Sequence, residues 1–251
     1  MSTETISFIG AGGAPLSGVL RRPEDDVRGS ALITHCFTCS QELHTVTRLA
    51  RALTEAGWMV LTFDFTGLGS SGGDFATSTL TTDVGDVGRA AVALLERDAG
   101  PCLLIGHSLG GAAAVLAAHR LRTLDGVVAI ASPADAGHVR HLLGDDGAAR
   151  IRAEGRAPVD IGGRPFEIGA GFLDDLDDHD VIAAASELTV PLLVVEAGAD
   201  TVVGADQTAR LAAAASGSLR RVAGADHLFS DRRHADELAR TILDWLDSIG
   251  R

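Results

Sequence analysis

One serine lies in a sequence pattern that is typical of a hydroxyl group positioned to attack a carbonyl. Ser108 occupies the centre of a GxSxG pattern at residues 106–110. In a nucleophile elbow, this pattern joins a strand to a helix, and the glycines let the two elements approach while the hydroxyl projects clear. The apolar residues 102–105 and the alanine-rich residues 110–121 provide this context. Ser108 is therefore the predicted nucleophile of an acyl-transfer reaction.

A second serine matches the same pattern, so the pattern alone is weak evidence in a chain with 30 glycines. Ser71 stands at the centre of residues 69–73. This segment extends a glycine-rich loop that follows the apolar residues 58–63, and no strand directly precedes it. We interpret Ser71 as a turn residue.

A serine nucleophile needs a base, and the base needs an acid to orient it. In this architecture the chain order is serine, acid, histidine. Asp200 follows the predicted strand at residues 191–196, and Glu196, still within that strand, is the competing acid. His227 lies in the loop after the last predicted strand. The predicted catalytic triad is Ser108, Asp200 and His227.

The reaction also needs two backbone N–H groups aimed at the oxygen that becomes negative, which form an oxyanion hole. Leu109, the residue after the nucleophile, is expected to supply one. Phe37, in the loop after residues 31–34, is expected to supply the other, with Cys36 as the alternative. We expect His35 to hold this loop in shape through a hydrogen bond.

The same loop contains a CxxC motif, Cys36 and Cys39, between a predicted strand and a predicted helix. This is the setting of dithiol redox motifs, so a redox protein is a rival interpretation. A zinc site would need two further ligands, and His44 and His107 do not form a recognisable set with the cysteines. We expect no metal and no cofactor.

The elements that must position these residues alternate between strands and helices. Such alternation predicts an α/β fold with a mostly parallel sheet, here of eight strands, and helices on both faces. The first two strands should form an antiparallel edge. The expected strands are residues 5–9, 17–20, 31–34, 58–63, 102–105, 127–131, 191–196 and 219–222, and the expected helices are residues 42–56, 83–97, 110–121, 205–215 and 235–249.

The alternation stops at residues 136–188, which contain an acidic cluster and only one candidate hairpin, around residues 162–168. We predict a single domain over residues 1–251, with a lid inserted at about residues 136–188. A short lid favours short acyl chains. The predicted substrate-contacting residues are His107, His138, Phe166, Phe172 and Leu173.

Composition excludes several classes of protein. The net charge of −13 disfavours nucleic-acid binding. All 21 basic residues are arginine, and the absence of lysine rules out Schiff-base chemistry. No cationic leader is visible, and no apolar run approaches the ~20 residues of a membrane span. We expect a cytoplasmic protein with a small-molecule ester as its partner, no nucleic acid and no membrane, while a homodimer stays open.

Six segments together resemble the α/β-hydrolase fold, and within it the hydrolase half of bacterial α/β-hydrolase–OsmC fusion proteins. The segments are residues 35–40, 63–69, 105–111, 163–166, 172–176 and 224–227. The resemblance implies the same triad. The sequence departs from the pattern of these fusion proteins in two ways. The chain ends at Arg251, without an OsmC partner, and Glu196 stands where many relatives have histidine.

These observations together favour a serine hydrolase of small carboxylic esters, with a preference for short acyl chains. A thioesterase or a peptidase would use the same triad. An epoxide hydrolase or dehalogenase of this fold is disfavoured. The resemblance implies that such an enzyme needs an aspartate at the position of Ser108. A dithiol redox protein and a catalytically idle binding module are the alternatives from other classes.

Overall fold

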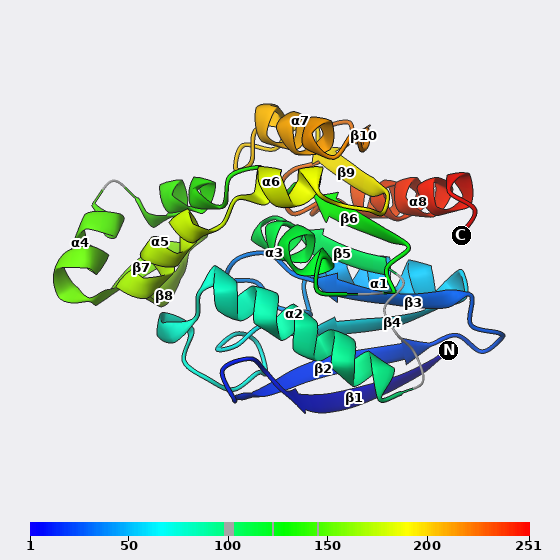
Figure 1. The fold of residues 1–251 in the computed structure, drawn as a ribbon, viewed down its shortest axis with the longest axis horizontal. Coiled ribbons are helices and arrows are strands. Elements are labelled where there is room, and N and C mark those ends of the chain that lie inside the picture. Colours follow the sequence, from blue (N-terminus) through cyan, green and yellow to red (C-terminus); the bar gives the residue numbers. More distant parts are fainter. Residues whose placement is uncertain (98–102, 122, 145) are drawn as a thin grey trace.

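A central sheet organises the molecule in the computed structural model, which describes residues 1–97, 103–121, 123–144 and 146–251 (Figure 1). Its strands are β1 (Ser2–Ile9), β2 (Pro15–Arg22), β3 (Gly29–Thr34), β4 (Trp58–Phe63), β5 (Leu103–His107), β6 (Gly126–Ile130), β9 (Leu192–Ala197) and β10 (Ser218–Val222). Among the described residues these eight pair in the order β1-β2-β4-β3-β5-β6-β9-β10. β2 runs antiparallel to both of its neighbours, and the pairs from β4 to β10 are all parallel.

The predicted fold class is therefore confirmed. The central strands β3, β4, β5, β6 and β9 are almost wholly buried, as expected for parallel strands covered on both faces. The expected strand at residues 102–105 begins at Cys102, which lies outside the described residues, and β5 continues to His107.

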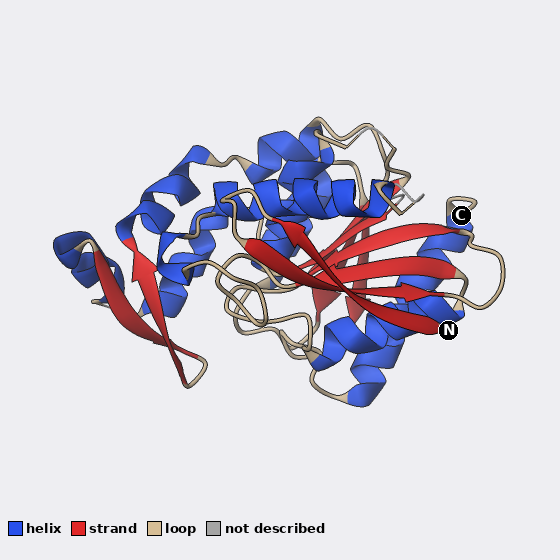
Figure 2. Ribbon diagram, turned by 90° about the horizontal axis from the view of Figure 1, so that it is seen from below, coloured by secondary structure: helices blue, strands red, loops and turns tan. Residues whose placement is uncertain are grey.

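Helices cover both faces of the sheet (Figures 1 and 2). They are α1 (His44–Glu55), α2 (Leu80–Leu95), α3 (Leu109–Ala118), α7 (Ala205–Ala214) and α8 (Arg232–Ser248). α1 and α8 share one apolar core, in which Leu49 and Leu53 meet Ile242. α2, α3 and α7 share the core on the opposite face. Gly57, with a φ of +93°, follows the end of α1 and lets the chain turn into β4.

Residues 136–188 leave the alternating pattern between β6 and β9. They form η2 (Ala136–Leu143), α4 (Gly147–Glu154), the hairpin β7 (Arg156–Ile161) and β8 (Arg164–Gly169), α5 (Ala170–Asp175), η3 (Leu176–Asp178) and α6 (Val181–Ser186). In Figures 1 and 2, α4, α5 and the hairpin project from one end of the sheet. A hairpin was expected only at residues 162–168, whereas the observed one begins at Arg156.

Among the described residues, no helix has both the length and the apolar character needed to cross a bilayer.

Candidate functional site

The turn from β5 to α3 carries Ser108 in an unusual backbone conformation. Its φ is +55° and its ψ is −126°, a region that costs a non-glycine residue energy and that occurs at functional turns. A Cβ atom added at Gly106 would overlap the carbonyl of Gly110, and one added at Gly110 would overlap the carbonyl of His35. Gly106 thus lets β5 and α3 pack this closely, and Gly110 lets the start of α3 approach the loop after β3.

Three side chains from distant parts of the sequence form a continuous hydrogen-bonded line at this turn. His227 Nε2 lies 3.0 Å from Ser108 Oγ, and His227 Nδ1 lies 2.8 Å from Asp200 Oδ2. An ionised carboxylate only accepts hydrogen bonds, so Nδ1 carries the imidazole proton and Nε2 accepts the serine hydroxyl. The structure brings together the three residues predicted as the triad, in the arrangement that general-base activation of a serine needs.

The loop after β9 holds Asp200 in its ionised form. Its side chain is 3 % exposed. Burial alone would raise the pKa of Asp200, but the hydrogen bond and charge of His227 and the amides of Val202 and Val203 outweigh it and lower the pKa. Those amides donate to Oδ1 at 2.8 and 2.9 Å, which leaves Oδ2 for the imidazole. Asp200 can therefore orient His227 and stabilise its cation.

Glu196, the competing acid, is bound elsewhere. Its carboxylate pairs with Arg221 at 3.0 Å and accepts the hydroxyl of Thr208 at 3.3 Å. Glu196 lies within β9, where the side chain contacts these neighbours and not His227. The choice between the two acids follows from the position of Asp200 beyond the end of the strand.

His107 lies in a different place from the predicted substrate wall. Its ring is buried, and Nε2 donates to the backbone carbonyl of His227 at 2.7 Å. Burial, and then the nearby His227, lower the pKa of His107 to about 3. The imidazole is therefore neutral and acts as a fixed N–H donor, which supports the His227 loop from behind. Its contact with substrate stays a prediction.

The loop after β3 forms one wall of a small cavity. Phe37 and Leu109, the two predicted oxyanion donors, both border it. His35 Nδ1 donates to the Cys36 carbonyl at 2.9 Å, as expected for a residue that shapes the loop. A disulfide joins Cys36 and Cys39, whose Cα atoms lie 5.3 Å apart.

A second small cavity is lined by Ser108 itself. His138 lines it, together with Val139, Leu142 and Val202. His138 Nε2 donates to the Val202 carbonyl at 2.8 Å, so the ring joins η2 to the Asp200 loop. His138 is thus the predicted substrate residue that the structure places beside the nucleophile.

The remaining three predicted substrate residues occupy different layers. The ring of Phe172 stacks on Phe37, with centroids 5.0 Å apart and planes 13° apart. Phe166 packs edge-on against Phe75 at 5.6 Å. Leu173 is 0 % exposed and belongs to the same core as Phe172, and the contact of these three residues with substrate stays a prediction. Hydrophobic residues at helical spacing signal burial but do not say which side chain faces a cavity.

Two further residues border the site that the sequence did not indicate. Asp83 of α2 lines the Phe37 cavity, and burial, followed by the charge of Asp86, raises the pKa of Asp83 well above its usual value. Arg164 of β8 donates to the Thr38 carbonyl, which links the hairpin to the loop after β3. Only the fold brings these side chains to the site, and no local pattern marks them.

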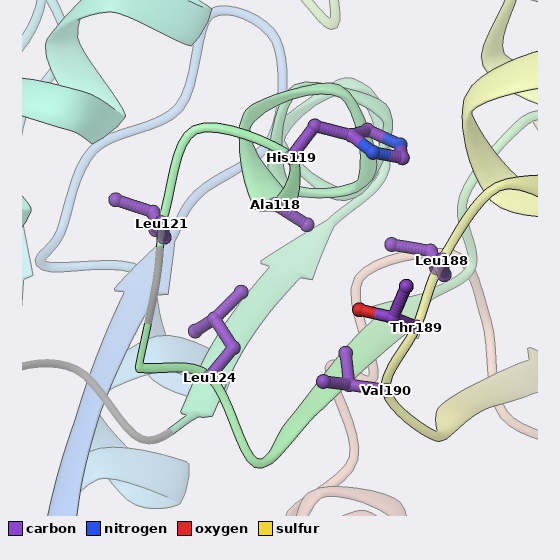
Figure 3. Close-up of a pocket in the computed structure, with 7 residues that line it drawn as sticks. All are labelled: Ala118, His119, Leu121, Leu124, Leu188, Thr189 and Val190. Atoms are coloured by element: carbon purple, nitrogen blue, oxygen red, sulfur yellow. The ribbon is translucent and has the colours of Figure 1, made fainter.

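Another hollow lies at the opposite end of α3 from Ser108 (Figure 3). His119 and Leu188 line it, but the His119 ring is engaged, because Nε2 donates to the Ala184 carbonyl at 2.8 Å. Among the described residues, no group of three or more histidine, cysteine, aspartate or glutamate side chains is arranged to hold a metal ion.

Comparisons with known proteins agree with this architecture. A family model described as "Alpha/beta hydrolase family" matches residues 31–241. The esterase domain of a Rhodothermus marinus protein is 36% identical over 98% of each chain, with a TM-score of 0.80. Est1E from Butyrivibrio proteoclasticus, solved with ferulic acid bound, is 20% identical over 97% of this chain and 99% of that chain, with a TM-score of 0.81. No curated protein matches the chain.

Proposed function

This chain belongs to the alpha/beta hydrolase family, and from that membership we propose that it hydrolyses small carboxylic esters through an acyl-enzyme formed on Ser108. The observation that carries the proposal is the line from Ser108 Oγ through His227 to Asp200, with separations of 3.0 and 2.8 Å. The 36% identity to a protein described as an esterase domain supports it. The motifs that resemble the hydrolase half of OsmC fusion proteins support the same assignment.

The reaction proceeds in two halves. Ser108 Oγ attacks the ester carbonyl while His227 Nε2 takes the hydroxyl proton, and Asp200 stabilises the imidazolium that results. The amides of Leu109 and Phe37 bind the negative oxygen of the tetrahedral intermediate. The intermediate collapses, His227 returns the proton to the leaving alcohol, and the acyl group stays on Ser108. A water molecule, deprotonated by His227, then releases the carboxylic acid.

Small acyl and alcohol groups fit the space beside Ser108 best. Two small cavities lie here, one bordered by Phe37 and Leu109 and the other lined by Ser108 and His138, and each has a volume of about 10 Å³. Sites for drug-sized ligands are larger, at roughly 300–1,000 Å³. Residues 136–188 act as the lid in this proposal, since Phe172 covers Phe37 and His138 borders the second cavity. Short-chain esters are therefore the proposed substrates.

The test is hydrolysis of p-nitrophenyl esters of increasing acyl length by the wild type and by Ser108→Ala. We expect kcat/KM to be highest for the shortest esters and to fall in Ser108→Ala by at least ~10³-fold. Ser71→Ala is the matched control, because Ser71 is the other serine in a GxSxG pattern and its hydroxyl donates to the Asp64 carbonyl at 2.6 Å. That variant should retain its activity.

A fluorophosphonate probe adds an independent readout. Mass spectrometry should find a single labelled residue, Ser108, in the wild type and none in Ser108→Ala. Full activity in Ser108→Ala, or labelling at another serine, would overturn the proposed function. A thioester hydrolysed far faster than the matching oxygen ester would replace the proposed substrate class while keeping the triad.

A further inference from the structure

The disulfide between Cys36 and Cys39 encloses the part of the chain that the proposed reaction depends on. Phe37, the expected second oxyanion donor, lies between the two cysteines. The amide of Phe37 donates to no other group in the part of the chain that the structure describes. It borders the same cavity as Leu109. The redox state of this pair therefore bears directly on the amide that would bind the oxyanion.

Hydrogen bonds to its carbonyl oxygen fix the peptide group between Cys36 and Phe37. The Cys36 carbonyl accepts hydrogen bonds from His35 Nδ1 at 2.9 Å and from the Cys39 amide at 3.1 Å. In a trans peptide the C=O and the N–H point in opposite directions, so fixing the carbonyl of Cys36 also fixes the direction of the Phe37 N–H. The disulfide keeps the Cys39 amide within reach of that carbonyl.

The turn does not have a relaxed backbone. Thr38 has a φ of +61°, in the left-handed region that β-branched residues rarely occupy. Glycine, which adopts this conformation freely, is absent from residues 36–39. A covalent link between the flanking residues opposes relaxation of such a turn, and opening the link removes that constraint.

The two sulfurs differ in their access to reagents. Cys36 is 3 % exposed, whereas Cys39 is half-buried at the surface of the loop. A thiolate from outside can therefore reach Cys39, with Cys36 as the leaving group. Access of this kind, together with a close partner thiol, is characteristic of redox-active cysteine pairs.

We propose that Cys36 and Cys39 form a reversible disulfide that sets the rate of ester hydrolysis by orienting the Phe37 amide. A thiolate of a dithiol reductant attacks Cys39 Sγ, the Cys36–Cys39 bond breaks, and Cys36 leaves and takes up a proton. The second thiol of the reductant displaces Cys39 from the mixed disulfide. The protein gains two electrons and two protons, and the reductant ends as a disulfide.

The size of the effect follows from what reduction leaves in place. Complete loss of one oxyanion donor lowers kcat by about 10²–10³-fold. The hydrogen bonds from His35 to the Cys36 carbonyl and from Arg164 to the Thr38 carbonyl do not involve the sulfur atoms, so we expect them to persist in the reduced loop. The amide should then remain oriented for part of the time, and we expect kcat to fall roughly tenfold with little change in KM.

The experiment compares the disulfide and dithiol forms of the full chain, with p-nitrophenyl acetate as substrate. Alkylation followed by mass spectrometry counts the free thiols in each sample. The reduced wild type should lose activity and regain it after oxidation by a small disulfide. The Ki of a small trifluoromethyl ketone, which forms an oxyanion on the serine, should rise by the same factor as kcat/KM falls.

Two variants separate this effect from general damage to the protein. Cys39→Ser should have the activity of the reduced wild type and ignore the redox treatment. Cys102→Ser, which replaces the third cysteine of the chain, should respond as the wild type does. Because Ser108→Ala reports the hydrolase activity itself, the two proposals can fail separately.

Three results would overturn the inference. One is equal kcat in the two forms when thiol counts prove that the disulfide has opened. The second is failure of the pair to form a disulfide under oxidation. The third is that the trifluoromethyl ketone binds both forms equally. Since the inference rests on the proposed function, a chain with no Ser108-dependent hydrolysis in either redox state would overturn both.

Discussion

Replacement of His107 with glutamine should make the protein less sensitive to acid. His107 is 2 % exposed, and burial lowers its pKa from 6.5 to about 3. The unfolded chain therefore binds a proton at a higher pH than the folded chain does. Stability contributed by the neutral ring is complete above pH 6.5 and declines as the pH falls, until the folded protein also takes up the proton.

The size of the loss at pH 5 follows from these values. One pKa unit corresponds to about 1.36 kcal/mol, and pH 5 lies 1.5 units below the unfolded value of 6.5. The wild type should lose about 2 kcal/mol between pH 8 and pH 5 through His107 alone. In His107→Gln the amide nitrogen can still donate to the His227 carbonyl, but nothing titrates at this position. The variant should lose about 2 kcal/mol less over the same interval.

Urea unfolding at the two pH values, followed by the fluorescence of Trp58 and Trp245, measures the difference. Each free energy of unfolding is obtained by linear extrapolation, and equal slopes show that the unfolding reaction is unchanged. Any packing cost of glutamine cancels, because only the change with pH is compared. His44→Gln, at the exposed start of α1, is the matched control and should behave as the wild type. Equal losses in His107→Gln and the wild type would refute the argument.

Two other substitutions test the site. Asp200→Asn should lower kcat by about 10⁴-fold. The amides of Val202 and Val203 would hold the carbonyl oxygen of the asparagine, so its NH2 group would donate to His227 Nδ1 and move the imidazole proton to Nε2. A loss below tenfold in steady-state kinetics would contradict this. Asp83→Asn should raise the melting temperature at pH 8, and the gain should shrink towards pH 4. Burial raises the pKa of Asp83, so the wild type loses stability as the pH rises above the unfolded value of 3.8. A gain that is constant with pH would contradict this reasoning.

The sheet could be predicted because each of its strands has a local signal. Residues 58–63 and 192–195 are apolar runs of the length expected for buried parallel strands, and the helices between strands show a clear 3.6-residue period. β4 has its predicted bounds, whereas the ends of most other elements differ from the prediction by one to three residues. β5, for example, continues through His107, because the strand ends only where Ser108 turns into α3. The local preference of the sequence for helix or strand determines where these elements form, whereas the residue at which a strand ends depends on tertiary packing.

Ser108, Asp200 and His227 could be selected from the sequence because the order serine, acid, histidine along the chain limits the candidates for the acid and the base. Asp200 lies beyond the end of β9, whereas Glu196 lies inside it. The sequence indicated this difference, because Asp200 follows Glu196 by four residues, after the apolar run has ended. The substrate wall had no comparable rule. Leu173 and Phe172 are adjacent in α5, yet only Phe172 stacks on Phe37. Which of the two residues contacts Phe37 depends on how residues 136–188 pack as a whole.

The site uses the same arrangement twice, namely a neutral buried histidine that holds a backbone carbonyl, and the sequence indicated it for His35 but not for His107. His107 donates to the carbonyl of His227, and His35 donates to the carbonyl of Cys36. Burial lowers the pKa of both rings, which keeps them uncharged and usable as fixed donors. One ring thus supports the loop of the base and the other supports the peptide of the Phe37 amide. Because the pKa of both rings is lowered in the folded protein, both lose their stabilising effect as the pH falls, and acid should weaken both halves of the site.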